Sequence, residues 1–121
     1  MGHDEAVLVI DDDDDWRHTL QMLLEGDGHR ALSASSAEEA MSVIATHRPI
    51  CALLDLHMPG VSGAELARRI RSQHGTDMVL IVLTGSVEDT DQDDAERAGV
   101  DYVLHKPLDM KRLRGILPRV S

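Results

Sequence analysis

Short runs of apolar residues alternate along the chain with longer segments in which apolar residues recur every three or four positions. Most of the short runs lack a polar and apolar alternation, which is typical of strands buried on both faces. The longer segments have the spacing of amphipathic helices. The pattern therefore predicts five strands, within residues 6–10, 29–34, 50–55, 78–83 and 101–105. The second is only weakly apolar and is expected at an edge of the sheet.

A helix is expected after each strand, and polar residues mark where several of these helices begin. The first helix has an apolar face of four residues at helical spacing: Trp16, Leu20, Leu23 and Leu24. Asp13 or Asp14 can cap it, because a carboxylate accepts the free backbone N–H groups of the first turn. Capping boxes at Ser36 and Ser62 predict the starts of the second and third helices.

The last three helices differ in the apolar surface they offer. In the third, the residues predicted to face inward are Leu66, Ala67 and Ile70, and those predicted to face water are Arg68, Arg69 and Arg71. Residues 87–98 carry many acids and almost no apolar stripe, which predicts a short and loosely held helix. The final helix has an apolar face made of Met110, Leu113, Ile116, Leu117 and Val120.

Five strands that alternate with five helices predict an α/β fold, with a parallel sheet covered by helices on both faces. Right-handed crossovers leave few topologies, of which the flavodoxin-like strand order 2-1-3-4-5 is common. That order places the first and third strands side by side in a three-layer (βα)5 structure. A length of 121 residues fits one domain that covers residues 1–121.

Acidic residues stand at the carboxyl ends of the first and third predicted strands. Asp11 and Asp12 follow the first, and Asp55 ends the third, just before Pro59 and Gly60. Ligands bind at this edge of an open parallel sheet. Because neighbouring strands lie about 4.8 Å apart, we expect the three acids to share one pocket. Like charges raise one another's pKa there, and Mg²⁺ relieves this through one or two carboxylates while keeping several waters.

The same pocket is suited to phosphoryl transfer. Asp55 can act as a nucleophile that forms an acyl phosphate while a metal ion neutralises charge on the transferring group. Thr84, which ends the fourth strand, offers a hydroxyl donor to a phosphoryl oxygen. Lys106, which follows the fifth strand, can place its ammonium over Asp55 and stabilise both the carboxylate and its phosphorylated form.

Together these residues resemble the receiver domains of two-component response regulators. The likeness covers essentially the whole chain and is carried by the acid pair at 11–12, an Asp-x-x-x-Pro-Gly element at 55–60, Thr84-Gly85 and Lys106-Pro107. The spacings, 29 residues from Asp55 to Thr84 and 22 from Thr84 to Lys106, are those of the family.

The resemblance implies a role for each site residue. It makes Asp55 the phosphoacceptor and gives Thr84 and Lys106 the task of sensing the phosphoryl group. It assigns Mg²⁺ to a set of ligands consisting of Asp11, Asp12, Asp55 and the backbone carbonyl of His57. It further implies a cis bond between Lys106 and Pro107.

The resemblance also implies the partners. The phosphoryl donor would be a histidine kinase or a histidine phosphotransfer protein. The output would be a changed surface on the fourth helix, the fifth strand and the fifth helix, read by a protein effector or an attached output domain. Such a domain is a phosphoacceptor that assists its own phosphorylation and dephosphorylation rather than a conventional enzyme.

Four residues bear on how this chain compares with the family it resembles. Many receivers have an aromatic residue three positions before the lysine, where this chain has Val103; Tyr102 stands one residue earlier and is expected on the opposite face of the strand. His57 and Ser86 lie two residues after Asp55 and Thr84, where family members tune the lifetime of the phosphoryl group.

Charge and composition narrow the range of possible binding partners and cellular locations. A formal net charge of −10 repels nucleic acids and anionic membranes within a Debye length of about 8–10 Å, so we expect neither as a direct partner. The sequence shows neither a long apolar segment nor a signal-peptide pattern, which predicts a cytoplasmic protein. Cys51, the only cysteine, lies in an apolar run, where a buried, inert thiol is expected.

Two other functions are compatible with parts of the sequence. In a phosphatase of the haloacid dehalogenase type the nucleophile lies in a strand-end Asp-x-Asp, which Asp11 and Asp13 match; Asp11 would then be the phosphorylated residue. A receiver-like module that binds a partner without phosphorylation is the other alternative. Calcium-loop spacing fails, because Trp16 stands where the loop requires glycine.

Overall fold

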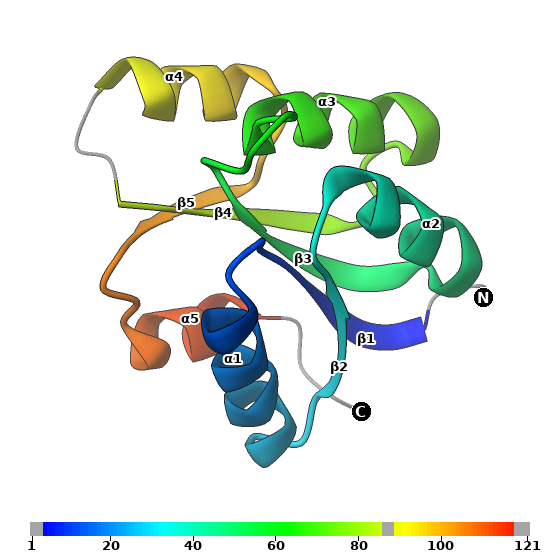
Figure 1. Ribbon diagram of the computed structural model, residues 1–121, viewed down its shortest axis with the longest axis vertical. Helices are drawn as coiled ribbons and strands as arrows, with labels where there is room; N and C mark the ends of the chain where they lie inside the picture. Colours follow the sequence, from blue (N-terminus) through cyan, green and yellow to red (C-terminus); the bar gives the residue numbers. More distant parts are fainter. Residues whose placement is uncertain (1–3, 86–88, 118–121) are drawn as a thin grey trace.

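Five parallel strands form the single sheet of the computed structural model, which describes residues 4–85 and 89–117, and the side chains of residues 6–85 and 93–117. The strands are β1 (Asp4–Ile10), β2 (Arg30–Ala34), β3 (Pro49–Asp55), β4 (Val79–Thr84) and β5 (Tyr102–His105). Their order is β2-β1-β3-β4-β5, with every neighbouring pair parallel. This confirms the predicted order and puts β1 beside β3 (Figure 1).

Five helices alternate with the strands: α1 (Asp14–Gly26), α2 (Ala37–His47), α3 (Gly63–His74), α4 (Asp89–Arg97) and α5 (Met110–Ile116). The side chains of Asp13, Ser36 and Ser62 cap α1, α2 and α3, each accepting the backbone N–H three residues on. Val120, predicted for the last helix, lies outside the described residues. None of the helices described combines the length and the apolar character needed to cross a membrane.

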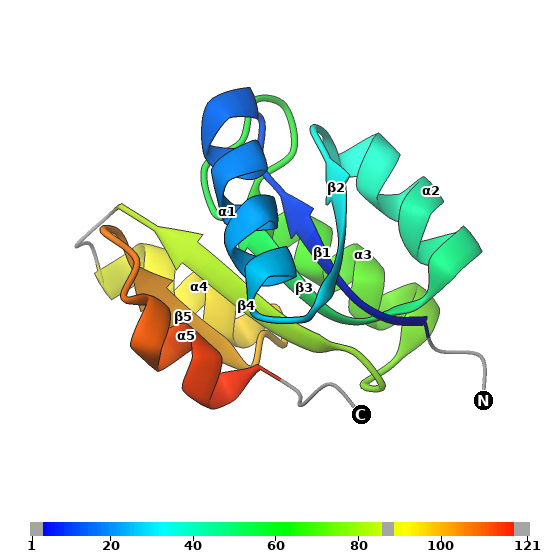
Figure 2. The same cartoon turned by 90° about the horizontal axis from the view of Figure 1, so that it is seen from below.

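Two apolar clusters hold the helices on opposite faces of the sheet. One joins α2, α3 and α4 to side chains such as Leu8, Leu54 and Val82, and the other joins α1 and α5 to side chains such as Leu53 and Ile81. Figures 1 and 2 show the resulting three layers. Successive residues of one strand enter different clusters because strand side chains alternate between faces.

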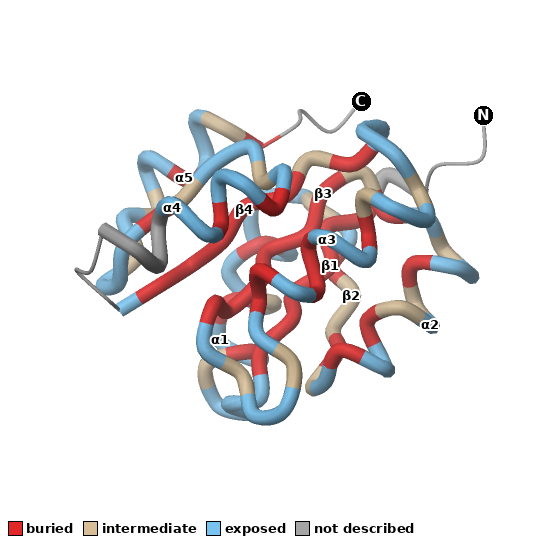
Figure 3. Tube along the Cα trace, turned by 90° about the horizontal axis from the view of Figure 1, so that it is seen from above, coloured by how far each residue is buried: buried red, intermediate tan, exposed pale blue. Residues whose placement is uncertain are grey.

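The centre of the sheet is almost fully buried, as the tube in Figure 3 shows. Cys51 lies in β3 between Val7 of β1 and Val79 of β4, which confirms the prediction that it is buried. Burial raises the pKa of its thiol to about 12, with a smaller contribution from the negative charge of Asp101. The thiol is therefore un-ionised at neutral pH.

The predicted apolar face of α1 is partly wrong. Leu20 and Leu24 are fully buried, but the side chain of Leu23 is 39% exposed and Trp16 is only partly buried. The buried residues of α1 are Arg17, Leu20 and Leu24, which lie three and four positions apart. The inward face of the helix therefore includes an arginine and excludes a leucine that pattern alone had placed there.

Arg71 does not face water as predicted, although Arg68 and Arg69 do. Its side chain is 14% exposed, and its guanidinium forms an ion pair of 2.8 Å with Asp101. It also donates hydrogen bonds to three backbone carbonyls, those of Gly75, Met78 and Gly99. Arg71 thus ties the end of α3 to the residues that precede β4 and β5, because it satisfies backbone carbonyls on both segments.

Tyr102 and Val103, the first two residues of β5, point in opposite directions as predicted. Val103 packs against the cluster that contains α2, α3 and α4, whereas Leu104 belongs to the opposite cluster. Tyr102 is 43% exposed. The alternation of strand side chains places Tyr102 on the face opposite to Val103, so Tyr102 does not occupy the position that Val103 fills.

The start of α3 lies directly against the end of β3. A Cβ atom built on Gly63 would lie 2.6 Å from the carbonyl oxygen of Asp55 and 2.8 Å from the Cα of Leu56. Both are backbone atoms, so neither can turn away as the end of a side chain would. Glycine is thus required at this position by the close approach of the two elements.

We expect the Gly63→Ala substitution to lower the free energy of unfolding by about 1–3 kcal/mol, because the added methyl group must displace backbone. Gly115→Ala in α5 is the matched control, since a Cβ there meets no atom within 4 Å. Alanine at Gly115 should stabilise the protein by roughly 0.5–1 kcal/mol. Urea denaturation of both variants checks this, and an unchanged stability of Gly63→Ala would contradict it.

Candidate functional site

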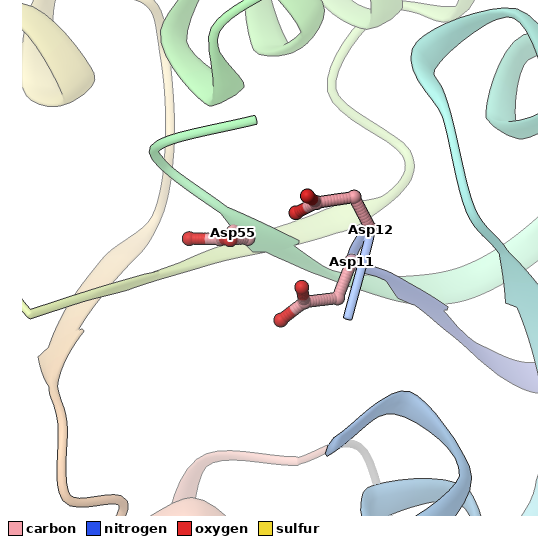
Figure 4. Close-up of side chains that lie close together, drawn as sticks. All are labelled: Asp11, Asp12 and Asp55. Atoms are coloured by element: carbon pink, nitrogen blue, oxygen red, sulfur yellow. The ribbon is translucent and has the colours of Figure 1, made fainter. Parts of the chain in front are cut away.

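The ends of β1 and β3 bring three carboxylates together. Ile10 pairs with Leu54 across the two strands, so Asp11 and Asp55 are the next residues on adjacent chains. Oxygen atoms of Asp11, Asp12 and Asp55 all lie within 4.8 Å of one another. Figure 4 shows the three side chains projecting into the same space at this edge of the sheet. The predicted convergence of the acids is therefore present.

Asp11 is the most deeply buried member of the cluster. Its backbone N–H donates to the carbonyl of Ala34 in β2, and its Oδ1 accepts the N–H of Asp13 at 2.9 Å. Its Oδ2 is buried without a hydrogen-bond partner among the described residues. Burial, together with the negative charges of Asp55 and Asp12, raises the pKa of Asp11, although the Asp13 N–H and Lys106 act in the opposite direction.

Asp55 ends β3 and is fixed by the loop that follows it. Its Oδ1 accepts the backbone N–H of His57 at 3.2 Å. The N–H of Leu56 donates to the carbonyl of Leu83 in β4, and the N–H of Gly63 donates to the carbonyl of Leu56. These bonds hold the backbone on both sides of Leu56 in place, so the carboxylate of Asp55 has a defined direction.

Lys106 supplies the positive charge of the site. Its Nζ lies 3.7 Å from Oδ1 of Asp55 and 3.8 Å from Oδ2 of Asp11. Its backbone N–H donates to the carbonyl of Thr84 at 2.8 Å, which anchors the residue beside β4. The Lys106–Pro107 peptide bond is cis, as the resemblance implied.

Thr84 and His57 lie at the border of the cluster. Thr84 is buried at the end of β4, one residue beyond Leu83, which is the β-sheet partner of Asp55. His57 is exposed, two residues after Asp55. Ser86, which the resemblance places where family members tune the phosphoryl lifetime, lies outside the described residues.

The cluster has the chemistry of a site for a small, hard divalent cation. All three side chains offer carboxylate oxygens, one of which, Oδ2 of Asp11, is buried without a hydrogen-bond donor among the described residues. Burial, with a smaller contribution from the charges of Asp55 and Asp12, raises the pKa of Asp11, and a bound cation would favour its ionised form. Mg²⁺ binds oxygen ligands of this kind through few carboxylates, so the residues present fit this ion.

Sequence reasoning missed two residues that support the site. Gly63 was seen only as part of a capping box, although its close contact with Asp55 depends on a crossing of α3 and β3 that no local pattern reveals. Arg17 was not singled out at all. Its spacing to Leu20 and Leu24 was a usable signal, because it puts a cation on the inward face of a helix that begins beside five aspartates.

Comparisons with known proteins agree with this geometry. Residues 7–117 match the family model of the response regulator receiver domain. The chain is 34% identical over 94% of its length to the transcriptional regulatory protein AfsQ1 of Streptomyces coelicolor. It is 32% identical over 97% of its length to the phosphate regulon transcriptional regulatory protein PhoB of Pseudomonas aeruginosa. It spans about half of each relative, 52% and 53% respectively.

Solved structures give the same result. A response regulator receiver protein from Pseudomonas putida superposes with a TM-score of 0.86 at 31% identity, covering 95% of this chain and 96% of that one. A CheY-like receiver domain protein from Methanospirillum hungatei also gives 0.86, at 25% identity, with 92% and 88% covered. The fold, the acid cluster with its lysine, and the match over residues 7–117 lead to one conclusion: this chain belongs to the receiver domain family of two-component response regulators.

Proposed function

We propose that Asp55 accepts a phosphoryl group from a phosphohistidine of a histidine kinase or a histidine phosphotransfer protein. The observation that supports this best is the position of its Oδ1, 3.7 Å from the Lys106 ammonium within a cluster of three carboxylates. An ammonium at that distance stabilises a carboxylate and also the additional negative charge of a phosphoryl group. Membership of the receiver family supports the same assignment.

Asp11, Asp12 and Asp55, with the backbone carbonyl of His57, would hold Mg²⁺. When bound, the ion supplies positive charge that offsets the charge on the transferring phosphoryl oxygens. The side chains of the protein carry out the transfer and orient the reacting groups. Asp55 attacks phosphorus as the P–N bond to the donor imidazole breaks, and Lys106 orients the carboxylate. The hydroxyl of Thr84 donates a hydrogen bond to a phosphoryl oxygen. This bond couples phosphorylation of Asp55 to the end of β4.

The partners proposed here follow from the family and from charge. The whole chain, residues 1–121, acts as one receiver domain whose α4, β5 and α5 surface changes on phosphorylation. An attached output domain or a separate protein effector would recognise this surface; the relatives, of which the chain spans about half, have room for an attached domain. The net charge of −10 argues against direct contact of this domain with nucleic acid or anionic membrane, and we place its function in the cytoplasm.

The other two functions find less support in the geometry. In the phosphatase alternative Asp11 is the nucleophile, but its side chain is only 3% exposed, against 11% for Asp55, and its Oδ1 is occupied by the Asp13 N–H. Asp13 itself caps α1. A module that works without phosphorylation would have no need for a lysine placed between Asp55 and Asp11.

The acceptor can be identified by exchanging each acid for its amide. With Mg²⁺ and a small phosphodonor such as acetyl phosphate, Asp55→Asn should abolish covalent phosphate capture, because the amide is not a nucleophile. Asp11→Asn should retain the acceptor and label more slowly. Intact-protein mass spectrometry measures both. Capture that survives Asp55→Asn and disappears in Asp11→Asn would support the phosphatase alternative instead.

Lys106 can be tested independently of the metal ligands. Lys106→Met should slow phosphorylation of Asp55 by about 10²–10³-fold, the usual loss when one preorganised donor is removed from developing charge. Lys111→Met is the control, since Lys111 is an exposed lysine of α5. Rates of phosphate incorporation at saturating Mg²⁺ give the comparison, and equal rates for the two variants would refute the role of Lys106.

The raised pKa of Asp11 predicts how stability depends on pH when divalent ions are chelated. A folded-state pKa above the unfolded value of 3.8 means that ionised Asp11 costs stability. This cost is absent below the unfolded pKa and complete above the folded pKa. Asp11→Asn should therefore be more stable than the wild type at neutral pH, and the difference should shrink as the pH approaches 4.

Thermal unfolding in the presence of EDTA measures this effect. Added Mg²⁺ should then stabilise the wild type more than Asp11→Asn, because binding to the folded state alone raises stability by mass action. The explanation fails if the variant is less stable than the wild type at neutral pH in EDTA.

A further inference from the structure

Four polar or charged residues are buried among those whose side chains the structure describes. One of them belongs neither to the acid cluster nor to the residues that would contact the phosphoryl group. Asp11, Asp55 and Thr84 belong to the site, and the fourth is Arg17 of α1, 8% exposed. A guanidinium cannot lose its charge in a protein, so its burial is unfavourable unless its donors are paired. The partners of Arg17 therefore indicate what it does.

The two partners of Arg17 differ in burial. Its Nη1 donates to the backbone carbonyl of Asp11 at 2.8 Å, and this bond is buried. Its Nη2 forms an ion pair of 2.6 Å with Asp14, whose side chain is 73% exposed. An ion pair with an exposed carboxylate is screened by water and contributes little. The hydrogen bond to the Asp11 carbonyl lies in a low dielectric, which strengthens it. It is therefore the stronger of the two interactions of Arg17.

That carbonyl belongs to the peptide unit that joins Asp11 to Asp12. The other backbone group of Asp11, its N–H, donates to the carbonyl of Ala34 in β2. With both of its backbone groups held, Asp11 cannot rotate about its backbone dihedrals without breaking a buried hydrogen bond. Rotation of the Asp11–Asp12 peptide would move Asp12, which lies beyond the end of β1 and has no strand partner.

We propose that Arg17 is a positioning residue for the metal site. It fixes the Asp11–Asp12 peptide, and thereby the relative direction of two carboxylates that would bind Mg²⁺, without contacting the ion itself. The inference rests on the function proposed above. Its chemical role is that of the hydrogen-bonding groups that orient ligands around a metal ion, whose removal typically weakens metal affinity about 10- to 100-fold.

The direction in which Mg²⁺ affinity changes when Arg17 is replaced distinguishes a positioning role from an effect of charge alone. Removing a cation close to the acids would, by charge alone, make a divalent ion bind more tightly. Loss of positioning makes it bind more weakly. Arg17→Met, which keeps much of the apolar stem and removes the donors, should therefore weaken Mg²⁺ binding by about tenfold or more.

The experiment measures the Mg²⁺ dissociation constant by isothermal titration calorimetry, with thermal stability recorded for every variant. Asp14→Asn removes the exposed ion pair and should leave the affinity unchanged, because the bond to the Asp11 carbonyl remains. Arg114→Met is the matched arginine control; it breaks the 2.7 Å ion pair with Asp27 between α5 and the end of α1, away from the acids. It should lower stability without changing the affinity.

A conservative variant keeps the test decisive if Arg17→Met folds poorly. Arg17→Lys retains one donor within reach of the Asp11 carbonyl and should give an affinity between those of the wild type and Arg17→Met. In ¹⁵N NMR spectra without metal, Arg17→Lys should shift the amide resonance of Asp12 more than Arg114→Met does.

Two results would overturn the inference while leaving the proposed function intact. In the first, wild-type protein binds Mg²⁺ and the Arg17 variants bind it equally or more tightly. In the second, Asp14→Asn loses as much Mg²⁺ affinity as Arg17→Met. Failure of the proposed function looks different, since wild-type protein would then bind no Mg²⁺, and the inference would fall with it.

Discussion

Repulsion between carboxylates is the constraint around which this protein is arranged. Three of them meet within 4.8 Å at one edge of the sheet, and burial, together with the charges of its two neighbours, raises the pKa of Asp11, the most buried of the three. Two chain segments hold them there, since Asp11 and Asp12 follow β1 and Asp55 ends β3. The ammonium of Lys106, 3.7 and 3.8 Å from two of the acids, compensates only part of the charge. The remainder makes the site receptive to a divalent cation.

The fold isolates this unfavourable edge from the parts that stabilise the protein. Two apolar clusters, one on each face of the sheet, contain most of the buried side chains among the described residues. The strand ends are then fixed by backbone contacts rather than by further packing: Asp11 by Ala34 and Arg17, and Asp55 through Leu56 and Gly63. Stability and charge crowding can therefore coexist because they involve different atoms.

Most of the fold and the principal site residues could be predicted from the sequence, for a physical reason. Strands buried on both faces and capped helices have local signatures, so the element order and Asp11, Asp12, Asp55 and Lys106 followed from position along the chain. Leu23 and Arg71 were misplaced because helical spacing gives the general direction of a side chain and not whether a neighbouring element covers it. Arg71 is partly covered because it donates to the carbonyl of Gly99, which precedes β5 and lies 28 residues away in sequence.

The contacts of Arg17 and Gly63 were also hidden from sequence reasoning, since each acts on backbone atoms of a different element. A carbonyl oxygen has the same chemistry at every position, so the sequence does not mark which one will need a partner. By contrast, the opposite directions of Tyr102 and Val103 followed from strand alternation alone, which depends on no distant contact.

The burial of Cys51 has a practical consequence for observing this domain at work. Its thiol lies inside the central strand and, with a pKa of about 12, contains almost no thiolate near neutrality. Maleimide and other thiol reagents attack the thiolate, so the native cysteine should remain unmodified in the folded protein. A fluorophore or spin label could thus be attached to a cysteine introduced on the surface of α4 or α5 without first replacing Cys51. The interior of the sheet would keep its native packing during such measurements.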